Sequence, residues 1–164
     1  MRLATIVGEM MSNDAVEGLV TLQERAVNLI KQLNMPLVEV SIVIQNMLSP
    51  MLTSLNEHAS NTNSEIPEKL KHQWPIRKPI NDDVASSLSV DKILSVVDED
   101  RMDILMTLIR VTMVETEMIL TDGISALRMW EHLARSQLSS ITSPGQLFSP
   151  FEIPEDWCQF FLKY

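Results

Sequence analysis

Residues 99 to 113 most constrain how this chain can fold. Their apolar residues recur at spacings of three and four, which places them on one helical face, and further apolar residues widen that face around much of the helix. Asp98 is a candidate N-cap, and Glu99, Asp100 and Asp103 complement the dipole of the first turn. We predict that this helix lies at the centre of a bundle. Its face consists of Met102, Leu105, Met106, Ile109 and Met113, extended by Ile104, Leu108 and Val111.

A second amphipathic helix is predicted near the N-terminus. Ser12 or Asn13 can cap it, and apolar residues then recur at helical spacing as far as Leu33. The helix is expected to end at 34–36, because the residue before Pro36 is pushed away from helical dihedrals.

The apolar segment from 37 to 48 fits two patterns, and Pro36 can open it as a first helical residue. Alternate residues are apolar, as in a strand, but a helical face also continues to Leu55. No second β-rich run is present to pair with a strand, so we predict a helix that Pro50 kinks or ends. The strand pattern comprises Val38, Val40, Ile42 and Ile44, and the helical face comprises Leu37, Val40, Ile44, Met47, Leu48, Met51 and Leu55.

Two further boundaries are predicted towards the C-terminus. Ser87 or Ser89 can cap a short helix that runs to Val97. Helical spacing continues to Ile141, and the one plausible break lies at Asp122-Gly123. Gly123 either forms a turn there or is tolerated inside one long helix, at a cost of about 1 kcal/mol relative to alanine.

Composition supports the same fold class. Of 164 residues, 45% are hydrophobic and only 4 are glycine, a mix that favours helices over strands. We therefore predict an all-α fold: a single-domain bundle of about four to six helices that spans residues 1–164.

A polar segment at about 57–87 interrupts the helical pattern and contains three prolines, so a long irregular loop is predicted. Cations gather there around a tryptophan, which makes a possible basic contact patch for phosphate or RNA. Because the whole chain carries a net charge of −9, we favour a loop that folds over the protein's own acidic faces. The patch consists of Lys69, Lys71, Trp74, Arg77 and Lys78.

Aromatic residues concentrate at the end of the chain. Residues 143–164 begin as a proline-rich strap and are predicted to end in a short helix that docks either on the chain's own bundle or on a partner. Either docking would bury apolar side chains that an isolated short helix leaves in water. The partner-binding candidates are Phe148, Phe151, Trp157, Phe160, Phe161 and Tyr164.

Charge and cysteine content exclude several classes of protein. The net charge of −9 opposes binding to nucleic acid and to anionic lipid, so neither nucleic acid nor a membrane is an expected partner. Cys158 is the only cysteine, which excludes a secreted disulfide scaffold and fits a reducing compartment. Since no signal peptide is recognised, we predict a cytoplasmic protein, although export without a signal is an alternative.

No catalytic, cofactor or metal site is predicted. The three histidines, His58, His72 and His132, lack the spacing of a metal site, and no phosphate-binding glycine motif occurs. Glu117 and Glu131 are most simply solvent-facing, and Cys158 is more simply a packed hydrophobe than a nucleophile.

Two functions remain as hypotheses. One is a non-enzymatic interaction protein, such as an adaptor, chaperone or assembly subunit, that binds a protein partner or its own copy through apolar helical surfaces and the aromatic tail. The other is a helical effector or regulator with a ligand pocket, or a cryptic enzyme; a cavity that gathers polar atoms of Glu131, His132, Cys158 or the segment 69–78 would favour it. The 11 methionines fit either a partner groove or core filling, and we favour core filling.

Overall fold

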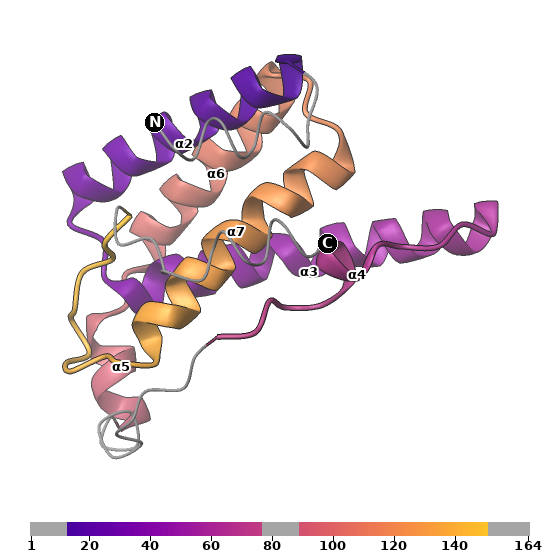
Figure 1. The fold of residues 1–164 in the computed structure, drawn as a ribbon. Coiled ribbons are helices and arrows are strands. Elements are labelled where there is room, and N and C mark those ends of the chain that lie inside the picture. Colours follow the sequence, from indigo (N-terminus) through magenta and orange to yellow (C-terminus); the bar gives the residue numbers. More distant parts are fainter. Residues whose placement is uncertain (1–12, 77–88, 151–164) are drawn as a thin grey trace.

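The computed structural model describes residues 13–76 and 89–150. These residues form helices without a strand, which confirms the predicted all-α bundle (Figure 1). A single antiparallel bridge joins Pro36 to Leu147 among them. The six helices of the described residues are α2 (Asn13–Leu33), α3 (Leu37–Thr62), α4 (Glu68–Lys71), α5 (Val90–Val96), α6 (Glu99–Glu115) and α7 (Leu120–Leu138).

The helices pack in two overlapping pairs. α2 lies beside α6, and α7 crosses α3 and packs along it, while α4 rests against α7 (Figure 1). α3 also contacts α6 and so links the two pairs. The second half of α3 projects past the other helices, and most of its residues are exposed there (Figure 1).

α3 is the central helix of the bundle. Residues 37–40 are all buried and further buried residues follow at helical spacing, so the apolar run at its start fits a strand as well as a helix. The helix does not end at Pro50, which lies inside it, so of the two expected effects of this proline the helix ending is wrong. Asn46 and Pro50 both lie on the exposed side, where water can bind the carbonyl that proline leaves unpaired. The buried residues are Leu37, Val38, Glu39, Val40, Val43, Ile44, Met47, Leu48 and Leu55.

α3 is also long and apolar enough to cross a membrane by length and composition. It is the one described helix that passes this test, and 44% of its most apolar window is buried inside the bundle. A core helix of a bundle has the same properties.

The predicted loop at 57–87 begins later than expected, and residues 77–87 of it lie outside the described residues. α3 continues to Thr62 and ends at Asn63, whose backbone is left-handed with φ 53°. Asparagine tolerates this conformation, which satisfies the last carbonyls of a helix. A short helix, α4, then follows within the same segment, and only the remaining described residues are irregular.

Two predicted N-caps are confirmed. The Ser89 side chain accepts a hydrogen bond from the Lys92 backbone N–H at 3.4 Å, and Asp98 accepts one from Arg101 N–H at 3.2 Å. These caps satisfy N–H groups that would lack a partner in the first turn.

The break between α6 and α7 lies at residues 116–119. Neither predicted alternative, a turn at Asp122-Gly123 or one long uninterrupted helix, is therefore correct, although Gly123 does lie inside a helix. Glu117 adopts φ 51°, and Met118 N–H donates to the Met113 carbonyl at 2.9 Å, which is the Schellman ending of a helix. Glutamate rarely adopts this conformation, and the glycine or asparagine that usually indicates such a helix end in a sequence is missing here. Gly123 instead lies in the first turn of α7, where a Cβ would come within 2.9 Å of Met51 Cε.

α6 is not the central helix, and that prediction is wrong. Only Leu105, Ile109 and Thr112 are buried. Several of its other apolar residues face outward, because α2 and α3 cover only part of its circumference.

The strap begins as predicted. Gln146 carbonyl accepts from Leu37 N–H at 2.7 Å, and Phe148 N–H donates to the Met35 carbonyl at 3.2 Å. The Gln137 side chain binds Ser149 through two hydrogen bonds: its Oε1 accepts from Ser149 N–H at 2.9 Å, and its Nε2 donates to the Ser149 carbonyl at 2.6 Å. Residues 146–149 are therefore bound between the α2–α3 turn and the end of α7.

Candidate functional site

Charged and polar side chains are buried on one side of α7. The exposed fractions are 3% for Arg128, 3% for Glu131 and 1% for His132. Their spacing of three and four residues places them on one helical face, and the segment 68–76 covers that face. We call Arg128, Glu131, His132 and Arg135, with this covering segment, the α7 polar cluster.

Arg128 is the hub of the cluster. Nη1 lies 2.6 Å from Glu131 Oε2, while Nε and Nη2 donate to the carbonyls of Leu70 and Lys71, both at 3.0 Å. Gln73 Nε2 donates to the other Glu131 oxygen at 2.9 Å. Both carboxylate oxygens thus have partners, as a buried charge requires.

The same covering segment is bound further along α7. Arg135 Nη1 donates to the Trp74 carbonyl at 2.7 Å, and His132 Nε2 lies 3.1 Å from the Pro75 carbonyl. The Trp74 ring also contacts the His132 ring at a centroid distance of 5.8 Å. Throughout the described residues, every buried side-chain nitrogen and oxygen has a hydrogen-bond partner.

The covering segment includes part of the predicted basic patch. It folds over the protein itself, but through its own carbonyl oxygens, which accept from arginines of α7, and not through its lysines on acidic faces. Lys71 is exposed and Lys69 half-buried, and the Trp74 indole N–H donates to the Lys69 carbonyl at 2.9 Å. Arg77 and Lys78 lie outside the described residues.

Glu131 is not solvent-facing, so that prediction is wrong, whereas Glu117 is exposed as predicted. The ion pair with Arg128 was visible in the sequence as an acidic residue three positions after a basic one. The covering segment that buries the pair lies 57 to 58 residues away in the chain, which no local pattern reveals.

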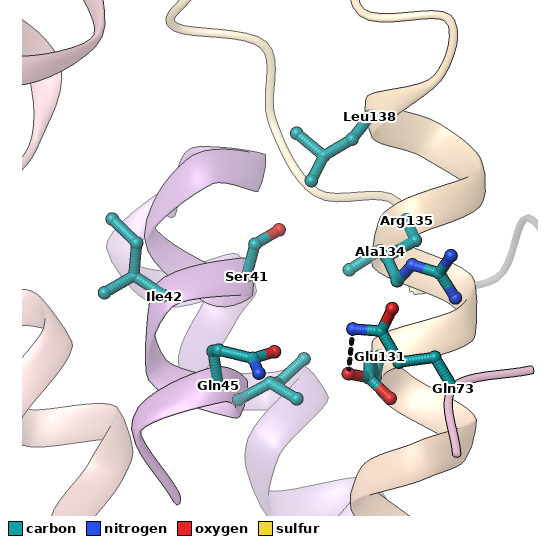
Figure 2. Close-up of a pocket in the computed structure, with 9 residues that line it drawn as sticks. Ser41, Ile42, Gln45, Gln73, Glu131, Ala134, Arg135 and Leu138 are labelled. Atoms are coloured by element: carbon teal, nitrogen blue, oxygen red, sulfur yellow. Dashed lines mark hydrogen bonds between the residues drawn. The ribbon is translucent and has the colours of Figure 1, made fainter. Parts of the chain in front are cut away.

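A cavity of about 320 Å³ lies beside the α7 polar cluster, between the first half of α3 and the second half of α7. Ser41 and Gln45 line it from α3, and Ala134, Arg135 and Leu138 from α7, with the Gln73–Glu131 pair at one end (Figure 2). Most of its wall is apolar, and among the described residues that line it Arg135 is the only one with a cationic side chain.

A second buried acid joins α3 to the start of α6. Glu39 is 0% exposed and binds Arg101 through two contacts, Oε1–Nη2 at 2.6 Å and Oε2–Nε at 3.1 Å. Its Oε1 also accepts from Asp98 N–H at 2.7 Å. The hydrogen bond from Arg101 to Glu39 raises the pKa of the guanidinium, which stays charged. These contacts hold the first turn of α6 against α3.

The outward face of α6 carries a row of apolar side chains. Ile104 is 48% exposed, Val111 45% and Val114 74%, and Leu108 between them is half-buried. We call Ile104, Leu108, Val111 and Val114 the α6 outward row. Ile104, Leu108 and Val111 are predicted from sequence as an extension of the core face, and no prediction is made for Val114, so the exposure of this row was missed.

Methionines of the helices α6 and α7, and of the turn between them, contribute to the core. Met129 is buried, and Met102, Met106, Met113 and Met118 are partly buried against the core cluster. Core filling, the favoured interpretation, is therefore confirmed for these five residues.

Only one residue of the predicted aromatic interface is described. Phe148 is 5% exposed and stacks on Trp130 with ring centroids 5.6 Å apart, so it docks on the chain's own bundle. The other five lie outside the described residues: Phe151, Trp157, Phe160, Phe161 and Tyr164.

No group of three or more histidine, cysteine or carboxylate side chains within 13–76 and 89–150 is arranged to hold a metal ion. Comparisons with protein-family models, with curated proteins and with solved structures gave no match.

Proposed function

We propose that this chain is a non-enzymatic protein–protein interaction module, serving as an adaptor, chaperone or assembly subunit, and that it binds its partner through the α6 outward row. The observation that carries this proposal is a row of exposed apolar residues along one side of α6, in which Ile104, Val111 and Val114 are 45% to 74% exposed.

Exposed apolar residues scattered singly are ordinary on protein surfaces, but a contiguous patch indicates an interaction site. Here the row follows the helix for almost three turns, from Ile104 to Val114. Covering each of these half-exposed side chains would contribute about 1 kcal/mol or more, which is typical of a helix face that docks on another protein.

The polar chemistry of the chain supports a binding role more than a catalytic one. In the α7 polar cluster, the charged groups are bonded to one another and to backbone carbonyls, so they hold the covering segment in place. Catalytic groups, in contrast, must reach a substrate atom. The aromatic residues after Pro150 remain a proposed second contact for the same partner.

The test is capture of partners from the native host by tagged chains. Val111→Asp combined with Val114→Asp should abolish capture while the helical content remains unchanged. The matched control is Val20→Asp on α2, an apolar residue 39% exposed outside the row. Equal capture by the wild type, the double variant and the Val20→Asp control would refute the role of the α6 outward row.

A second candidate function is supported by the cavity between α3 and α7. It brings Gln73 and Glu131 together at one wall, as the ligand-pocket hypothesis required, and Arg135 could hold an anionic group (Figure 2). Both Glu131 oxygens are already bonded, however, so Arg135 would carry recognition. Thermal stabilisation by small carboxylates that disappears in Arg135→Gln would favour this function over the first.

A further inference from the structure

We propose that the partner bound by the α6 outward row is a second copy of this chain, with the two α6 helices paired antiparallel about a two-fold axis. This inference rests on the proposed function and names the partner of the same surface.

The row is bordered by charges of opposite sign on one edge. At 3.6 residues per turn, Asp103 and Arg110 project from the same edge of the row, two turns apart. Both side chains are exposed, and within the described residues neither forms an ion pair or a side-chain hydrogen bond. The chain therefore presents an acid and a base, separated by a fixed distance, beside an uncovered apolar row.

A two-fold axis perpendicular to α6 pairs these charges. Such an axis reverses the helix direction but keeps the same edges together, so Asp103 of each copy lies opposite Arg110 of the other. The axis passes near Thr107, and Ile104 of one copy then packs near Val111 of the other. One surface supplies both halves of the interface, with two ion pairs at its border.

A parallel pairing lacks this complementarity. It would bring the Asp103 edge of one copy against the opposite edge of the other, where Arg101 already binds Glu39. In the antiparallel arrangement, the acids at the two ends of α6, Asp100 and Glu115, approach each other across copies. The charge of Glu115 is already compensated by its ion pair with Arg25, so the arrangement with the better charge match is the antiparallel one.

The experiment is light scattering on the full chain across a concentration series, combined with charge exchange. Each subunit has a mass of 18.6 kDa, and we expect a concentration-dependent species of twice that mass. Arg110→Asp should weaken dimerisation at least about tenfold, because the two-fold axis applies the change at two places. Arg110→Asp with Asp103→Arg should restore it, since each new base again faces a new acid.

The control is Lys71→Asp, which makes the same change of charge at an exposed position on α4. It should leave dimerisation unchanged. A monomer at all soluble concentrations overturns the inference, as does a dimer that Arg110→Asp weakens no more than Lys71→Asp. If the chain is monomeric but Val111→Asp with Val114→Asp still abolishes capture of another protein, the inference fails and the proposed function stands.

Orientation is tested by cysteine crosslinking in a Cys158→Ser background, which removes the only native thiol. Thr107→Cys should form a disulfide-linked dimer on mild oxidation, because that residue lies near the two-fold axis. Val114→Cys should not form this dimer, because Val114 lies at one end of the row and the two Val114 residues of an antiparallel pair lie at opposite ends. The reverse result would refute the antiparallel arrangement.

Discussion

Two arginine–glutamate pairs in this chain differ mainly in burial, and we predict that their contributions to stability differ accordingly. Arg128 and Glu131 have side chains only 4% exposed, whereas those of Arg25 and Glu115 are 44% and 53% exposed. The perturbation is Arg128→Met, with Arg25→Met as the matched control. Methionine keeps most of the apolar length of arginine and removes the charge and the donors.

The expected magnitude follows from what each arginine leaves behind. Without Arg128, Glu131 stays buried with a charge that only Gln73 contacts, and the carbonyls of Leu70 and Lys71 lose their donors. Removing one partner of a buried pair costs about 3–5 kcal/mol. The exposed pair contributes about 0–1 kcal/mol. Because a small domain is stable by about 5–15 kcal/mol, only the first change removes a large fraction of the total.

Urea denaturation followed by far-UV circular dichroism measures both free energies of unfolding. A second background, Glu131→Leu, separates the ion pair from the carbonyl contacts. With the carboxylate already replaced, Arg128→Met should cost clearly less, since no unpaired acid is left buried. The reasoning is refuted if Arg128→Met costs no more than Arg25→Met. An equal cost in both backgrounds would instead assign the effect to the carbonyls.

Three further predictions concern single positions. Phe148→Ala should cost about 3–5 kcal/mol and change Trp130 fluorescence, because the ring is 5% exposed and stacks on that indole. Gly123→Ala should change the free energy of unfolding by no more than about 1 kcal/mol, since the helix gains propensity while the flexible end of Met51, 2.9 Å from the new Cβ, must move. Burial raises the pKa of Asp122 above its ordinary value, so the native state holds the proton more tightly than the unfolded state. Above the native pKa, the ionised Asp122 therefore destabilises the native state, and Asp122→Asn should melt at a higher temperature than wild type. As the pH falls through that pKa, Asp122 becomes neutral and the difference in melting temperature should shrink.

Each of these has a contrary outcome. An unchanged melting temperature for Phe148→Ala would place the strap outside the stable core. A loss above about 2 kcal/mol for Gly123→Ala would show that Met51 cannot move aside. An Asp122→Asn advantage that is constant or grows towards acid pH would contradict a pKa raised by burial.

Features that depend on residues within a few positions were predictable from sequence. The Ser89 and Asp98 caps act three residues along the chain, and the end of α2 at Leu33 follows from the sequence Asn34-Met35-Pro36. Helix rather than strand at 37–48 followed from the lack of any partner strand. Periodicity and capping are local, so the all-α fold could be predicted without knowing which helix meets which.

Features that depend on distant residues required the tertiary structure. Glu131 is buried because a segment 57 to 58 residues earlier lies over α7. α6 is apolar around much of its circumference, so its sequence does not indicate which of its residues are covered. That depends on the positions of α2 and α3. Only the packed structure decides that α3 occupies the centre and that Ile104, Leu108, Val111 and Val114 face outward, because burial is a property of neighbours in space and not of neighbours in sequence.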